Sequence, residues 1–243
     1  MKKIYEKNEL TFALVCIAVY CVVQSLANPL NDLLGVEYSA SALFCVIEAV
    51  LIILFISKNG LAEKYGLCKP HCPATVFLFY IPLAVLASAN LWSGVTAAYS
   101  PAGIVCHTVC MLCVGFLEEI IFRGFLFLAM AKTNPKAAVI VSSVTFGIGH
   151  IINLINGSGM DFIGNLMQVV LAVAIGFLFV TIFCRGGSLI PCIATHCVIN
   201  IMAGFAAADT ALEIRLIRCV IMTALTVGYT VFLTKTSPKT EKI

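Results

Sequence analysis

The chain has 243 residues, of which 61% are hydrophobic and only 11% are charged, and its mean hydropathy is +1.04. Soluble domains carry about 25% charged residues, so this composition excludes an ordinary soluble enzyme or binding module. The formal net charge of +3 comes from lysines gathered in alternate connections, and it implies no nucleic-acid partner.

Apolar runs predict the architecture. A bilayer core of about 30 Å is crossed by about 20 mostly apolar helical residues. Eight runs meet this description, at roughly 10–27, 40–57, 74–93, 102–119, 136–153, 162–184, 188–206 and 213–234. We therefore predict an all-α, polytopic membrane protein with about eight transmembrane helices. The first run is long enough to span and lacks a well-formed cleavage site, so we expect a retained helix.

The basic residues predict how these helices are oriented. Lys and Arg side chains precede the first run and recur in the connection 58–73, at 132–136, at 185 and in the tail after 234. The alternate connections 28–39, 94–101 and 154–161 contain none, and Arg215 and Arg218 are the exceptions. The positive-inside rule then predicts eight spans with both termini cytoplasmic.

Turn-forming residues mark several helix ends. The stretch NPLND at 28–32 predicts a break after the first span. Ser100 and Pro101 fit the N-cap and first turn of the fourth span. The stretch KTNPK at 132–136 is expected to separate the fourth span from the fifth.

Three charged residues stand out in FLEEIIFRG, residues 116–124. An ionisable group at the centre of a membrane costs about 2.5–3.5 kcal/mol, so such residues are functional candidates. Arg123 is four residues after Glu119, which places the two on one helix face and predicts a structural ion pair. Glu118 points elsewhere and is left as the freer carboxylate. The alternative is that all three extend to the interface at the end of the span.

Later spans carry further polar side chains. His150 ends the stretch FGIGH, where Gly147 and Gly149 are expected to permit close helix approach. His196 and Asn200 are four residues apart and share a helix face, where they could donate to an oxyanion. A lone histidine in a span could simply donate to a backbone carbonyl. Two histidines, an asparagine on one of their faces and a glutamate pair are less easily explained by packing alone.

Depth in the membrane is the difficulty with grouping these residues. Glu118 falls near the end of the fourth predicted span, His150 near the opposite end of the fifth, and His196 near the middle of the seventh. For them to meet, either the span boundaries must shift or a water-filled cavity must reach into the membrane.

The ordered trio Glu-Glu-x-x-x-Arg at 118–123, Phe-x-x-x-His at 146–150 and His-x-x-x-Asn at 196–200 resembles the CPBP family. This family comprises the Abi and CAAX-protease-like membrane proteins related to the type II CAAX prenyl endopeptidase. The resemblance covers about residues 100–206, which would form the catalytic core. Residues 1–99 would add three N-terminal spans, and 207–243 the last span and a basic tail.

The resemblance implies peptide-bond hydrolysis in a conical cavity that opens to the cytoplasm and the membrane. Glu118 and His150 would activate water, and His196 and Asn200 would stabilise the oxyanion. Glu119 and Arg123 would give structural support. Glu118, His150 and His196 could also ligate Zn²⁺, but the same groups can activate water without a metal.

The implied substrate is a peptide or lipidated peptide at the membrane, prenylated or a peptide precursor. Bacterial relatives suggest a multi-pass protein of a bacterial cell membrane. Two other functions stay open. One is a non-catalytic immunity or scaffold protein, which would not need all four polar residues. The other is a proton-coupled transporter, although no internal repeat of the kind common in transporters is visible.

Overall fold

The computed structural model describes residues 1–155, 161–207 and 211–237, and all its regular elements there are helices. In chain order they are α1 (Lys2–Lys7), α2 (Glu9–Leu34), α3 (Ser39–Lys58), η1 (Ala74–Tyr80), α4 (Ile81–Ser88), η2 (Ala89–Leu91), α5 (Pro101–Glu119), η3 (Ile120–Phe127), α6 (Leu128–Ala131), α7 (Pro135–Gly149), α8 (Ile152–Ile155), α9 (Phe162–Gly186), α10 (Ile190–Ala203) and α11 (Leu212–Thr236). The tail lysines Lys239 and Lys242 and most of the connection 154–161 lie outside the described residues.

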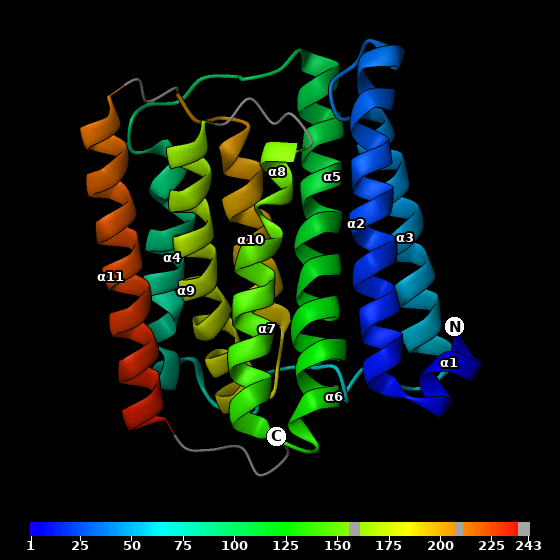
Figure 1. Cartoon of the computed structure of the whole chain (residues 1–243). Coiled ribbons are helices and arrows are strands. Elements are labelled where there is room, and N and C mark those ends of the chain that lie inside the picture. Colours follow the sequence, from blue (N-terminus) through cyan, green and yellow to red (C-terminus); the bar gives the residue numbers. More distant parts are fainter. Residues whose placement is uncertain (156–160, 208–210, 238–243) are drawn as a thin grey trace.

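The long helices run side by side and alternate in direction (Figure 1). Within the described residues, seven helical segments are long and apolar enough to cross a membrane. The eighth predicted span forms α10, which is apolar but has only 14 residues. The prediction of an all-α, polytopic membrane protein is therefore confirmed, with seven rather than eight segments in the described residues long enough to cross a membrane.

The first span does not break where the sequence predicted. The helix α2 continues through Pro29 and ends only at Gly35, which adopts a left-handed conformation with φ 69°. A left-handed residue after the last turn is a common helix terminator, and glycine takes it without steric cost. The prediction of a break at 28–32 was wrong, and Asn28, Asn31 and Asp32 extend the helix instead.

The fourth span is also longer than predicted. It runs over Pro101–Ala131, 31 residues, because α5 passes without interruption into the π-helical segment η3 and then α6. Its start is as predicted, since the Ser100 side chain accepts a hydrogen bond from the Gly103 N–H at 3.1 Å. The predicted end at 119 was wrong, and Glu118 and Glu119 therefore lie in the middle of the span.

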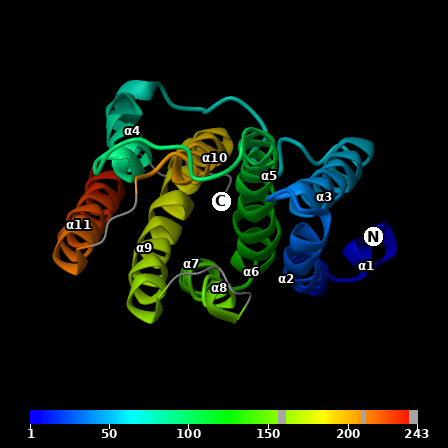
Figure 2. The same cartoon turned by 90° about the horizontal axis from the view of Figure 1, so that it is seen from above.

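Four helices surround a common centre when the bundle is viewed from above: α5, α7, α9 and α10 (Figure 2). Glycines permit their close approach. A Cβ atom at Gly115 would lie 2.8 Å from the Cys197 backbone nitrogen, and one at Gly147 would lie 2.7 Å from the Val173 nitrogen. Gly147 therefore acts as predicted, whereas a Cβ at Gly149 would meet open space. The prediction for Gly149 was wrong.

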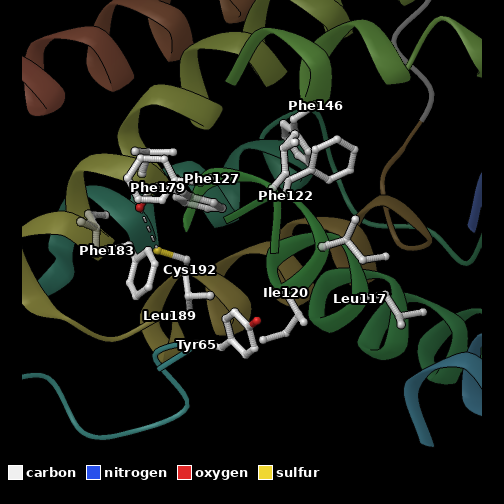
Figure 3. Packing of buried hydrophobic residues seen from close by; sticks show 14 of the residues in the cluster. Tyr65, Leu117, Ile120, Phe122, Phe127, Phe146, Phe179, Phe183, Leu189 and Cys192 are labelled. Atoms are coloured by element: carbon white, nitrogen blue, oxygen red, sulfur yellow. Dashed lines mark hydrogen bonds between the residues drawn. The ribbon is translucent and has the colours of Figure 1, made fainter. Parts of the chain in front are cut away.

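One end of this centre is filled by an aromatic core (Figure 3). Phe127, Phe179 and Phe183 are each 1% exposed and surround the buried Cys192, whose thiol donates to the Phe179 carbonyl at 3.6 Å. Tyr65, from the connection between α3 and η1, is also buried. The bundle is thus closed toward the end that carries this connection.

The basic residues gather at that same closed end, where α1 begins and α11 ends (Figure 1). They are Lys2, Lys3, Lys7, Lys58, Lys64, Lys69, Lys132, Lys136, Arg185 and Lys235. Among the described Lys and Arg residues, only Arg215 and Arg218 lie toward the opposite end, in the first turns of α11. The fold therefore collects on one face the charges that were scattered along the sequence.

This distribution predicts that the closed, basic end faces the cytoplasm. A green fluorescent protein fused to the C-terminus should fluoresce, because that domain would fold inside the cell. Alkaline phosphatase at the same position should be inactive, because its disulfides form only in an oxidising compartment. An epitope inserted after Gly35 should be reached by antibody on intact cells. An active phosphatase fusion with a dark fluorescent fusion would reverse the orientation.

Candidate active site

A buried ion pair anchors the centre of the bundle. The Arg123 guanidinium lies 3.2 Å from Glu119 Oε1, and both side chains are 0% exposed. The guanidinium also lies 3.9 Å from the centre of the Phe146 ring, a geometry that favours a cation–π interaction. The pairing predicted from the spacing is confirmed. The alternative, in which these side chains extend to the interface, is excluded by their complete burial.

His196 lies between the two carboxylates. Its Nδ1 atom is 2.8 Å from Glu119 Oε1, and its Nε2 atom is 3.7 Å from Glu118 Oε2. The close approach of α5 and α10 at Gly115 makes this contact possible. One imidazole therefore faces both members of the adjacent glutamate pair, which point in different directions from one helix.

Glu118 has a second partner that sequence reasoning missed. The Tyr20 hydroxyl, from α2, donates a 2.7 Å hydrogen bond to Glu118 Oε1. One helical turn further along the same face of α2, the Gln24 amide donates to Glu48 of α3 at 3.3 Å. A tyrosine and a glutamine inside an apolar run were the available signal, but a sequence cannot say which carboxylate they would meet.

His150 and Asn200 are placed at the same centre. His150 Nδ1 lies 3.1 Å from the Phe146 carbonyl oxygen, and its own carbonyl accepts from the Asn165 amide at 2.8 Å. Asn165, buried on α9, was also missed by the sequence analysis. Asn200 is one helical turn beyond His196, and its side chain forms no hydrogen bond with another described residue. Its amide is therefore available to a bound molecule.

Two cavities meet at these residues. A cavity of about 650 Å³ lies among η2, α7, α9, α10 and α11, and its wall includes His150, His196 and Asn200. A second cavity, of about 710 Å³, lies among α2, α3, α5 and α7, and its wall includes Glu118, His150 and Asn200. The four predicted residues therefore line one connected region, although no ion pair or hydrogen bond joins Glu118 directly to His150 among the described residues.

Both cavities reach the end of the bundle opposite the basic residues. Their walls include Asp32, Glu37 and Tyr99 in one case and Asp161 and Arg215 in the other. Two expectations drawn from the sequence therefore conflict. If the termini are cytoplasmic, as the basic residues predict, the cavities cannot open to the cytoplasm, as the family resemblance implied.

The candidate metal ligands do not form a ready metal site. Among the described residues, no group of three or more His, Cys, Asp or Glu side chains is arranged to hold a metal ion. The Nδ1 contacts of His196 with Glu119 and of His150 with a backbone carbonyl would leave Nε2 of each ring as the ligating atom. Because Glu118, His150 and His196 do not converge on one point, they do not form a zinc site in this arrangement.

Residues 100–202 match the model of the protein family described as Type II CAAX prenyl endopeptidase Rce1-like. This segment begins at the N-cap of α5 and includes Glu118, His150, His196 and Asn200, so the family resemblance is confirmed over it. No curated protein and no solved structure matches the chain. Tyr20, in contrast, lies outside the matched segment.

The buried pair yields a stability prediction. Arg123→Ala should lower the free energy of unfolding by about 3–5 kcal/mol, because it leaves Glu119 buried without its cation. The measurement is thermal unfolding of the detergent-solubilised protein, with folded yield in membranes as a second readout. Restoring neutrality with Glu119→Gln in the same chain should recover part of the loss. A variant as stable as the parent but slow in catalysis would assign the pair to the chemistry instead.

Proposed function

We propose that this chain, a membrane protein whose residues 100–202 carry the Rce1-like region, is an intramembrane endopeptidase. It would hydrolyse a peptide bond in a membrane-associated peptide. The observation that carries this proposal is the position of Glu118, which borders a cavity and lies 3.7 Å from His196. A carboxylate beside water, an imidazole and a free amide are the groups that peptide hydrolysis requires.

Glu118 would act as the general base. It takes a proton from a water molecule in the cavity while the water oxygen bonds to the substrate carbonyl carbon. His150 lines the same cavity and would help to position this water. When the tetrahedral intermediate collapses, the carbon–nitrogen bond breaks and Glu118 returns the proton to the leaving amine. The products are a carboxylic acid and an amine.

His196 and Asn200 would stabilise the negative oxygen of the intermediate. The Asn200 amide can donate without giving up another hydrogen bond. With both ring nitrogens protonated, His196 donates through Nδ1 to Glu119 and presents its Nε2–H toward Glu118 and the substrate. The four charges of Glu118, Glu119, Arg123 and His196 then sum to zero, which is favourable for a buried cluster.

Glu119 and Arg123 would position these groups rather than react. Glu119 Oε1 holds the imidazole of His196, and Arg123 holds Glu119. Phe146 completes the arrangement, since its ring lies 5.7 Å from that of His196 and 5.2 Å from that of His150, measured between centres. The proposed catalytic groups are thus held by the buried Glu119–Arg123 pair and by Phe146, which lines both cavities.

We further infer that the substrate reaches the cavity from the non-cytoplasmic side. Both cavities open at the end opposite the basic residues, and the positive-inside rule assigns the basic end to the cytoplasm. This orientation favours a peptide precursor exposed at the outer face over a prenylated protein in the cytoplasm. It replaces the earlier expectation of a cytoplasmic opening.

An enzyme agrees better with the geometry than the two other functions. A transporter needs a route to both faces, whereas buried phenylalanines fill the bundle toward its basic end. A scaffold has no need of a buried histidine between two carboxylates, an arrangement that costs stability unless it is compensated.

The proposal is tested by cleavage of a peptide library with the purified protein in detergent. Glu118→Gln should lower kcat by about 10²–10⁴-fold, because it removes the base while keeping the shape. The double variant Glu118→Gln/His150→Ala should be scarcely slower, since groups that act as a unit are not additive. Cleavage of no peptide by the folded parent would reject the function.

Glu48→Gln is the matched control for this experiment. Glu48 is another carboxylate within the membrane, but it lines neither cavity. The Glu48→Gln control should cleave at the rate of the parent. Equal losses of rate in both variants would instead indicate a general effect of removing a carboxylate within the membrane. Activity lost with a chelator and restored by zinc would instead show that the step depends on a metal.

The hydrogen bond from Tyr20 predicts a separate effect. Tyr20→Phe should lower kcat by about 10–100-fold, because a hydrogen bond to a charged group contributes about 1.5–3 kcal/mol. KM should be unchanged if the hydroxyl only orients Glu118. Tyr99→Phe is the control, because the Tyr99 hydroxyl lines the same cavity but pairs with Tyr38. A lower melting temperature with unchanged kcat would make Tyr20 merely structural.

A further inference from the structure

A polar stripe runs along the helix α2, outside the segment that matches the family. Tyr20, Gln24, Asn28 and Asp32 recur at every fourth residue, so they share one helix face. All four line the cavity of about 710 Å³. The stripe exists only because α2 continues through Pro29 to Leu34, and it leads from Glu118 to the open end of the bundle.

The two cavities that meet at His150 and Asn200 differ in character. The wall on the α2 side contains Asp32, Glu37 and Glu118 and no Lys or Arg. The wall on the α9 side contains Met167, Leu171, Ile175 and Met222, with Arg215 and Arg218 near its opening. A peptide lying across the site would therefore place a polar segment on one side of the scissile bond and an apolar segment on the other.

The opening of the α2 side carries negative charge. Hydrogen bonds from the Ser100 hydroxyl and backbone lower the pKa of Glu37, which keeps this carboxylate ionised at neutral pH. Asp32 is exposed beside the same cavity. Deeper in, His107 is 2% exposed, and its Nδ1 atom has no hydrogen-bond partner among the described residues. This wall therefore contains a buried hydrogen-bonding atom, His107 Nδ1, that no described residue pairs with.

We propose that the α2 stripe binds a polar, positively charged segment of the substrate peptide, a step that rests on the proposed function. Gln24 and Asn28 would bond the extended backbone, and Asp32 with Glu37 would meet a basic side chain. Twelve helical residues from Tyr20 to Asp32 span about 18 Å. An extended chain covers this distance in about five residues, so the basic residue should lie about five residues from the scissile bond.

The test is peptide binding to the Glu118→Gln variant, measured by fluorescence polarisation in detergent. One labelled peptide joins an apolar half to a polar half with two lysines about five residues from the junction, and its partner carries aspartates there. The lysine peptide should bind more tightly. Adding Asp32→Lys should weaken its binding by about ten-fold, because an attraction becomes a repulsion. Asn28→Leu should weaken both peptides by about five-fold through a lost hydrogen bond.

Glu213→Lys is the matched control, because Glu213 is exposed at the same end of the bundle and lines neither cavity. It should leave both affinities unchanged. Equal binding of the two peptides, no binding of either, equal effects of Asp32→Lys and Glu213→Lys, or no effect of Asn28→Leu would each overturn the proposal. Because binding is measured without turnover, stripe-dependent binding without cleavage by the parent would reject only the catalytic function.

Discussion

The structure depends on one buried electrostatic constraint: Glu119 must be neutralised in the middle of a transmembrane bundle. Arg123 does this from the same helix, and His196 approaches the same oxygen from another. A carboxylate without such partners would be strongly destabilising at this depth. The requirement fixes the register of α5 against α10, because only one axial position of α10 brings His196 to Glu119. Once that register is set, the adjacent Glu118 necessarily turns toward the cavity.

The length of the span that contains the two glutamates allows them to lie in its middle. The span containing the glutamates has 31 residues, considerably more than the bilayer core requires. Its π-helical segment begins directly after Glu119, and the Ser142 hydroxyl of α7 donates to the Phe122 carbonyl within it at 2.9 Å. Segments with π geometry are frequent at functional sites, where they adjust the direction of side chains. Here the segment allows Arg123 to pack against Phe146 while keeping its pairing with Glu119.

The site is completed by parts of the chain that the family match does not include. The Tyr20 hydroxyl bonds Glu118, and the α2 stripe forms one wall of the larger cavity. The matched segment supplies the proposed reacting groups, whereas α2, outside the match, contributes much of one cavity wall.

The sequence by itself determined the helical membrane class, the pairing of Glu119 with Arg123 and four of the polar residues that gather at the centre, but not Tyr20 or Asn165. These follow from local rules, namely the length of apolar runs, the spacing of residues on one helix face and the cost of charge in lipid. The sequence misplaced the ends of α2 and of the fourth span, because proline and charged residues normally end apolar runs unless tertiary partners compensate them. Only the tertiary structure decided that His196 bridges the two glutamates, that Tyr20 bonds Glu118 and that the cavities open opposite the basic end. Each of these depends on which helices are neighbours and at what depth, and no single segment contains that information.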